Sequence, residues 1–225
     1  MLARRTLSRN DRTRHGKSDA THDWSLEFLA DELLKAVGRV WPGRVIWGGH
    51  SWGGKLAALL AARHPDRTSA VVLIDPSPAS AVPISAQDFV ETTLAPELGS
   101  WPSLEAADAH AKCLPHYASG TNEVMAAFHR GLIQQADGTV HTIARQEWLL
   151  EIARIALTID HSETIRRASA PTILVMAGDS MFWQEGTNVA ALPNAVHEIV
   201  AGQHWIHWQK PTEVSAIIRR FLENL

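Results

Sequence analysis

The sequence predicts an α/β fold built on a mostly parallel sheet that is flanked by helices. Two apolar runs of strand length, 44–48 and 70–74, enclose an Ala/Leu-rich helical stretch over residues 51–64. A strand, a helix and a second strand joined by short connections form a βαβ unit, in which the strands are parallel and the crossover is right-handed. A third apolar run, 171–177, indicates that the same sheet resumes far along the chain.

The remaining elements fit one domain with an insertion. The chain has 225 residues, which is enough to bury a full core. We assign residues 1–75 and 171–225 to the core. Residues 76–170, which carry the helical patterns 123–132 and 143–157 but no strand alternation, are expected to form a mostly helical insertion.

Amphipathic helices are predicted at both ends of the core. Residues 25–37 place leucines on one helical face, with Ser25 as N-cap, and residues 211–225 begin with Pro at a helix start. A further strand is predicted over residues 196–200. Both helices are therefore expected to pack against the sheet.

Composition narrows the class of ligand. Lys and Arg total 21 against 24 Asp and Glu, a formal net charge of -3, so no global charge favours nucleic acid. The single cysteine, Cys113, excludes an intrachain disulfide, and no Cys/His spacing indicates a metal site. No apolar run approaches the roughly 20 residues that span a bilayer. We therefore expect a cytoplasmic protein that binds a small molecule, with no cofactor, metal, nucleic acid or membrane.

Gly49-His50-Ser51-Trp52-Gly53 is the pattern G-x-S-x-G, placed between a predicted strand and a predicted helix. In this setting the pattern indicates a nucleophile elbow, a sharp turn that presents the serine hydroxyl. The glycines avoid clashes at the turn, and the helix N-terminus directs its amides to a developing oxyanion. Ser51 is therefore the candidate nucleophile, and the Trp52 amide a candidate oxyanion donor.

A serine hydroxyl needs a histidine base and an acid that orients it. His204 follows a strand near the C-terminus, where the chain order Ser, acid, His places the base. His207 is interpreted as a surface or core histidine, and His50 as structural, with its side chain pointing away from the serine.

Two carboxylates compete for the role of the acid. Asp75 ends the strand V-V-L-I-D, and Asp179 ends the later strand in M-A-G-D-S. Parallel strands deliver their carboxyl ends to one edge of the sheet, so either side chain is placed to reach the imidazole.

At these residues the chain resembles the α/β-hydrolase superfamily, in particular its lid-bearing esterases, haloperoxidases and C–C hydrolases. D-R-T-R-H-G-K-S-D at 11–19, G-H-S-W-G-G at 49–54 and A-G-Q-H-W-I-H-W-Q-K-P at 201–211 match three family motifs in order. The resemblance implies that Ser51 is the nucleophile, that His204 is the base and that 76–170 is a helical lid. Most members carry the acid as G-x-x-D, where this chain has Met181. Others use the strand that Asp75 ends, which favours Asp75.

The resemblance also predicts a missing part. The family places several strands and an H-G loop, which supplies a second oxyanion amide, before the motif that begins here at Asp11. We therefore expect an N-terminally truncated α/β-hydrolase fold with an exposed sheet edge, from a truncated reading frame. The alternative function is a non-catalytic or severely impaired small-molecule-binding protein.

The expected function is that of a serine hydrolase that cleaves a carboxylic ester, or a related acyl or C–C bond, through an acyl-enzyme. The nine tryptophans, several of them near the motifs, suggest an apolar or aromatic substrate. His50, Trp183 and Trp205 are the predicted residues of the substrate pocket. The sequence leaves the oligomeric state open.

Overall fold

The core is a four-stranded parallel sheet. The computed structural model describes residues 23–78, 81–180, 192 and 195–225. The sheet has the order β1-β2-β6-β7 and all of its neighbouring strands are parallel. Its strands are β1 (Val45–Ser51), β2 (Thr68–Pro76), β6 (Thr172–Ala177) and β7 (Ala195–Val200). The predicted fold class is confirmed.

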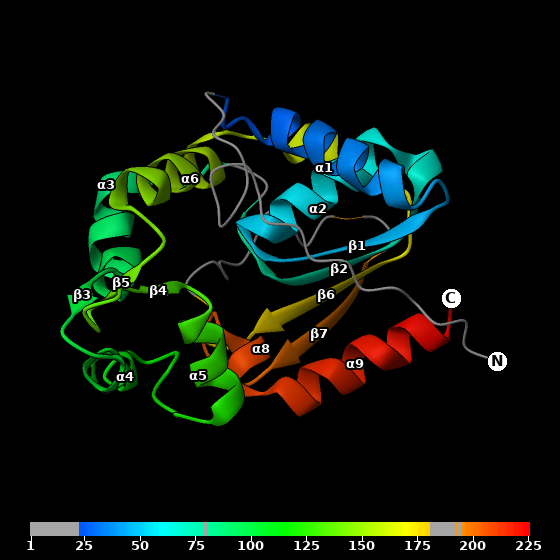
Figure 1. Cartoon of the computed structure of the whole chain (residues 1–225). Helices are drawn as coiled ribbons and strands as arrows, with labels where there is room; N and C mark the ends of the chain where they lie inside the picture. The colour runs from blue at the N-terminus through cyan, green and yellow to red at the C-terminus, as the bar shows by residue number, and fades with distance from the viewer. Residues whose placement is uncertain (1–22, 79–80, 181–191, 193–194) are drawn as a thin grey trace.

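Helices cover both faces of the sheet (Figure 1). Helices α1 (Leu26–Val40) and α2 (Trp52–Arg63) pack on one face, and α9 (Pro211–Glu223) packs on the other. Alternate residues of β2 explain the two cores: Val71 and Leu73 join the cluster under α1 and α2, whereas Val72 joins the cluster under α9. The molecule therefore has three layers.

Helix α1 begins where the sequence predicts. The hydroxyl oxygen of Ser25 accepts a hydrogen bond from the amide of Phe28 at 3.2 Å, as an N-cap residue does. The helix then continues to Val40, three residues beyond the predicted end, before Pro42 stops it.

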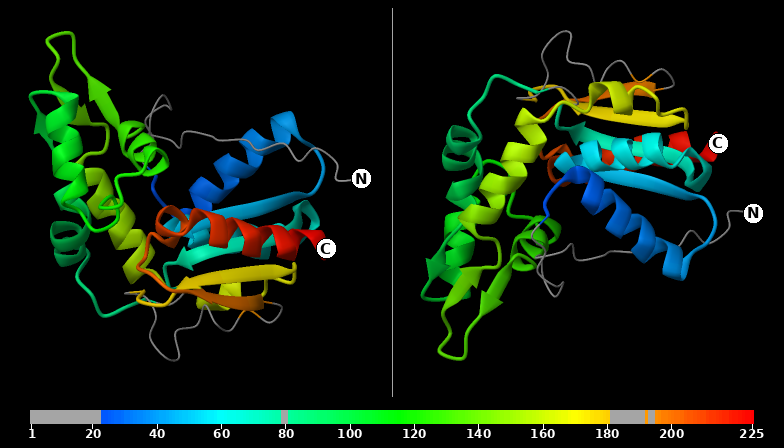
Figure 2. Two further views of the ribbon diagram at one scale, coloured as in Figure 1. Left: turned by 90° about the horizontal axis from the view of Figure 1, so that it is seen from below. Right: turned by 90° about the horizontal axis from the view of Figure 1, so that it is seen from above.

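Residues 77–171, named here the insert segment, lie between the adjacent strands β2 and β6. Figure 2 shows the segment beyond the carboxyl ends of the sheet strands. Its longer helices are α4 (Leu104–Lys112), α5 (Asn122–His129) and α6 (Gln146–Thr158), and α3 (Ala86–Phe89) and α7 (Ser162–Ile165) are single turns. Short strands also occur here, although the sequence shows no strand alternation. Strands β3 (Ser100–Trp101), β4 (Leu132–Gln134) and β5 (Val140–Thr142) form an antiparallel sheet in the order β3-β5-β4.

Strand β1 lies at one edge of the described sheet, where it pairs with β2 alone. The apolar residues Val40 and Trp41, which precede this strand, are 72% and 55% exposed. The motif at 11–19 lies outside the described residues. No helix in the described ranges is long and apolar enough to cross a bilayer.

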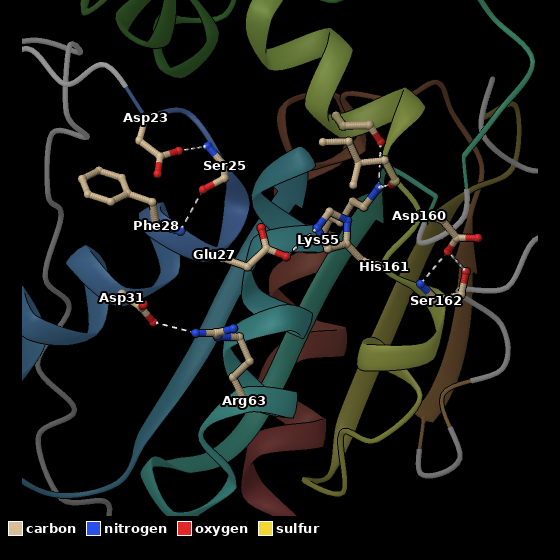
Figure 3. A network of polar contacts seen from close by, with 12 residues as sticks. Asp23, Ser25, Glu27, Phe28, Asp31, Lys55, Arg63, Asp160, His161 and Ser162 are labelled. Carbon is tan, nitrogen blue, oxygen red and sulfur yellow. Dashed lines mark hydrogen bonds and ion pairs between the residues drawn. The ribbon is translucent and has the colours of Figure 1, made fainter.

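The buried lysine Lys55 joins helix α2 to the end of α6 (Figure 3). Its side chain is 1% exposed, and Nζ donates to the carbonyls of Ala156 at 3.0 Å and Ile159 at 2.7 Å. Beside this contact, Nε2 of the buried His161 lies 3.1 Å from Oε1 of Glu27 in α1. Lys55 thereby attaches the helix that follows Ser51 to the insert segment, and the His161–Glu27 contact attaches the insert segment to α1.

Burial lowers the pKa of Lys55 to about 8, and the negative charges of Asp160 and Glu27 oppose that shift. The amine is therefore mostly protonated at neutral pH, and it loses its proton at a lower pH than an exposed lysine does. Burial also lowers the pKa of His161, as does the nearby Lys55 charge.

Candidate active site

Ser51 occupies a strained turn between β1 and α2. Its backbone has φ 54° and ψ −128°, and α2 begins at the next residue, Trp52. A Cβ atom on Gly49 would lie 2.1 Å from the carbonyl oxygen of Gly53, so the turn requires glycine at that position. Ser51 is thus held half-buried at the N-terminus of α2, as the G-x-S-x-G pattern predicts.

Asp75 lies at the end of the neighbouring strand and is completely buried. Oδ1 accepts a hydrogen bond from the amide of Ala177 at 3.0 Å, and Oδ2 accepts one from the Ser180 hydroxyl at 2.8 Å. Nδ1 of His204 lies 2.6 Å from the same Oδ2 atom. Three donors, two from the end of β6 and the residues just after it and one from His204, therefore hold one carboxylate, whose own backbone is strained at φ 37°.

The contact with Asp75 fixes the tautomer of His204. A carboxylate oxygen only accepts, so Nδ1 carries the proton and Nε2 keeps its lone pair. His204 is 4% exposed, so the ring has little freedom to leave this geometry. The pair can therefore accept a proton at Nε2 and stabilise the resulting imidazolium.

Of the two candidate acids, the structure brings Asp75 to His204. Asp179 is exposed, and its backbone amide donates to the carbonyl of Gly202 at 2.9 Å. Both aspartates follow apolar strands in the sequence. In the structure, however, Asp75 is buried against His204, whereas Asp179 is exposed.

Ser51 and Asp75 lie at the same edge of the sheet. In the β1–β2 register Ser51 pairs with Pro76, and the amide of Ser77 donates to the Ser51 carbonyl at 3.0 Å. The serine turn is therefore attached directly to the residues that follow Asp75. Such an edge, outside the carboxyl ends of parallel strands, is where open α/β sheets bind ligands.

His50, which was interpreted as structural, contacts residues 201–209, named here the histidine loop, which include the short helix α8 (Ile206–Gln209). Its Nε2 donates to the backbone carbonyl of His204 at 2.8 Å. Its ring lies 4.4 Å from that of His204 and 4.3 Å from that of His207, between centroids. Burial lowers the pKa of His50 to about 2 and that of His207 to about 4, so both rings are neutral around His204.

Trp205 and Trp208 connect the histidine loop to the insert segment. The ring of Trp205 stacks on the buried His116 at 4.2 Å, and Trp208 stacks on Tyr117 at 5.3 Å. Trp205 therefore lies between the histidine loop and the insert segment, and its role in a substrate pocket stays a prediction. Trp183 lies outside the described residues.

Two contacts of the site were not predicted. Ser180 was not singled out, although a polar residue just beyond a buried strand is a signal for a group at the sheet edge. His116 had no sequence signal, because its partner Trp205 is far away in the chain.

Within the described ranges, no group of three or more His, Cys, Asp or Glu side chains is placed to hold a metal ion.

Comparison with known proteins agrees with this architecture. The family model described as the alpha/beta hydrolase fold matches residues 10–211. The mouse sn-1-specific diacylglycerol lipase ABHD11 is 25% identical over 94% of this chain and 70% of its own length. Esterase YbfF of Escherichia coli is 23% identical over 95% of this chain and 81% of its own. Among solved structures, E-2-(acetamidomethylene)succinate hydrolase aligns with a TM-score of 0.76 and 21% identity, over 94% of this chain and 79% of that one. The chain belongs to the α/β-hydrolase fold family.

Proposed function

We propose that the protein is a serine hydrolase that cleaves a carboxylic ester through a covalent acyl-enzyme on Ser51. The observation that carries this proposal is the buried Asp75–His204 pair, 2.6 Å apart, at the sheet edge where the strained turn holds Ser51. The lipase and esterase names of the relatives support the same chemistry.

In the acylation step, the Ser51 hydroxyl oxygen attacks the ester carbonyl carbon while Nε2 of His204 takes the hydroxyl proton. The carbonyl π pair moves to oxygen and forms a tetrahedral oxyanion. The backbone amide of Trp52, at the N-terminus of α2, is the proposed donor to this oxyanion. The intermediate collapses, the carbon–oxygen bond to the alcohol breaks, and the alcohol takes the proton from His204.

In the deacylation step, water replaces the alcohol. His204 removes one proton from the water, whose oxygen attacks the acyl carbon, and the bond to Ser51 breaks. The proton returns to the Ser51 oxygen and the free acid leaves. Asp75 stays ionised throughout and stabilises the imidazolium.

The insert segment is the proposed lid. It covers the carboxyl ends of the strands and contacts the histidine loop through Trp205 and Trp208. A cover at this position excludes water from the acyl-enzyme and shapes the substrate pocket.

Labelling with a fluorophosphonate probe tests the nucleophile. We expect the wild-type chain to be labelled and Ser51→Ala to be unlabelled, because the probe reacts only with an activated serine hydroxyl. Labelling that persists in Ser51→Ala would contradict the proposal. A folded wild-type protein that is inert to the probe but binds small molecules would favour the non-catalytic alternative.

A further inference from the structure

The insert segment contains a pocket of ≈ 270 Å³, named here the insert pocket. It is lined by the C-terminal half of α5 and the loop that follows, by the start of α6, and by residues 94–98. Most of its wall is apolar, with side chains that include Leu94, Leu98, Phe128, Leu132, Trp148 and Leu149.

Two indirect contacts relate the insert pocket to residues that neighbour Ser51 and His204. Leu94 and Leu149 of its wall pack on the same buried cluster as Trp52, the residue after Ser51. On the other side, Tyr117 of its wall stacks on Trp208 in the histidine loop at 5.3 Å. The wall of the insert pocket is therefore linked by packing to Trp52 beside the nucleophile and to Trp208 near the base.

Two polar side chains that line the insert pocket, Tyr117 and Glu97, contact each other, and His116 behind them contacts the same carboxylate. The Tyr117 hydroxyl donates to Oε2 of Glu97 at 3.3 Å, and Nε2 of His116 lies 3.1 Å from Oε1 of the same carboxylate. Burial raises the pKa of Tyr117, so its hydroxyl stays protonated and keeps this bond. Arg130 at the rim is exposed, where water screens its charge. The insert pocket therefore favours a neutral, apolar group.

The volume limits the size of that group. Whole drug-sized ligands occupy pockets of about 300–1,000 Å³, so ≈ 270 Å³ suits one arm of a substrate better than a complete one. A cavity of about 150 Å³ already holds benzene. The insert pocket thus has room for one aromatic ring or an aliphatic chain of similar bulk.

We propose that the insert pocket binds one apolar arm of the ester, a medium-length aliphatic chain or a single ring, while the ester carbonyl reacts at Ser51. This inference rests on the proposed ester hydrolysis. Every methylene that enters such a pocket adds binding free energy, so the chain length of the preferred ester is set by the depth of the insert pocket.

Two neighbouring alanines of α5 provide a matched test. Ala127 lines the insert pocket, whereas Ala126 is exposed on the same helix. For the wild type we expect kcat/KM to rise about fourfold per added methylene from p-nitrophenyl acetate to hexanoate. In Ala127→Phe the added ring fills the insert pocket, so the loss of kcat/KM should grow with chain length and reach about tenfold or more at hexanoate, mainly through KM. Ala126→Phe should keep the wild-type profile.

A second series varies the alcohol, from ethyl acetate to hexyl acetate. If kcat/KM of Ala127→Phe falls with chain length only in the acyl series, the acyl chain occupies the insert pocket. If it falls with chain length only in the alcohol series, the alcohol occupies it. Leu98→Ala, which enlarges the insert pocket, should shift the highest kcat/KM to esters with longer chains. This variant replaces Ala127→Phe in the test if Ala127→Phe does not fold. A change in kcat/KM of the pocket variants that is the same for all esters, or no change at all, would overturn the proposal. Because Ser51 labelling and acetate hydrolysis would persist in that case, the outcome differs from a failure of the proposed function.

Discussion

Replacing Asp75 by Asn is expected to lower kcat for ester hydrolysis by about 10³–10⁴-fold while the protein stays folded. The new side-chain amide would keep the acceptor for the Ala177 amide but present NH₂ where Oδ2 now meets Nδ1 of His204. The imidazole would then hold its proton on Nε2, where it cannot accept the proton of the Ser51 hydroxyl. Steady-state kinetics with p-nitrophenyl butyrate, together with a thermal melt, measures the effect.

Asp179→Asn is the matched control for this prediction. It makes the same change of charge and size on an exposed carboxylate at the neighbouring strand end. We expect kcat to stay within about twofold of the wild type, as is usual for a surface change remote from the reacting atoms. Activity that is lost in Asp179→Asn and kept in Asp75→Asn would reverse the assignment of the acid.

Replacing Lys55 by Met is expected to destabilise the protein by an amount that grows with pH. Met fills a similar volume but leaves the carbonyls of Ala156 and Ile159 without their donor, at a cost of about 1–3 kcal/mol for the buried carbonyl of Ala156 and less for the part-buried one of Ile159. Removing the amine also removes the cost of burying its charge. That second contribution changes with pH, because the pKa of the amine is about 8 in the folded state, against an ordinary value of 10.5 for lysine.

The direction of the pH effect follows from the protons that each state binds. Between about pH 8 and 10.5 the unfolded chain keeps the Lys55 proton and the folded protein has lost it, so the free energy of unfolding of the wild type rises with pH relative to Lys55→Met. The full shift corresponds to at most about 3 kcal/mol. Urea unfolding of both proteins from pH 7 to 10 measures the difference.

Lys35→Met is the control for the lysine prediction. Lys35 lies on the exposed face of α1, with a side chain that is 66% exposed and an ion pair to Glu32. The difference in stability between this variant and the wild type should stay within about 0.5 kcal/mol over the same pH range. A stability difference between wild type and Lys55→Met that stays constant, or that shrinks as pH rises, would contradict the account of Lys55.

The parallel sheet and its helices were predictable because their signals are local. Glycines bound the strand that ends at Ser51, and a proline follows the helix that ends at Arg63. The small sheet of the insert segment was not predictable. Its strands have only two or three residues, which is too short to show an alternation of apolar and polar side chains.

The candidate nucleophile and base were predictable for the same reason, since each lies in a short motif. The acid was not decided by residues alone, because Asp75 and Asp179 both end apolar strands. The role of Lys55 in the fold was also hidden. Its acceptors lie 101 and 104 residues further along the chain, so no local pattern marks a lysine in an Ala/Leu-rich helix as buried.

The central claim is that Ser51 carries the acyl group during turnover, and mass spectrometry of the acid-quenched enzyme tests it most directly. Mixed with excess p-nitrophenyl acetate and quenched within the first turnovers, the wild type should gain the mass of one acetyl group, located by digestion on the peptide that contains Ser51. Ser51→Ala should gain none. Steady turnover of the ester with no acetyl group on Ser51, or with the acetyl group on another residue, would contradict the account.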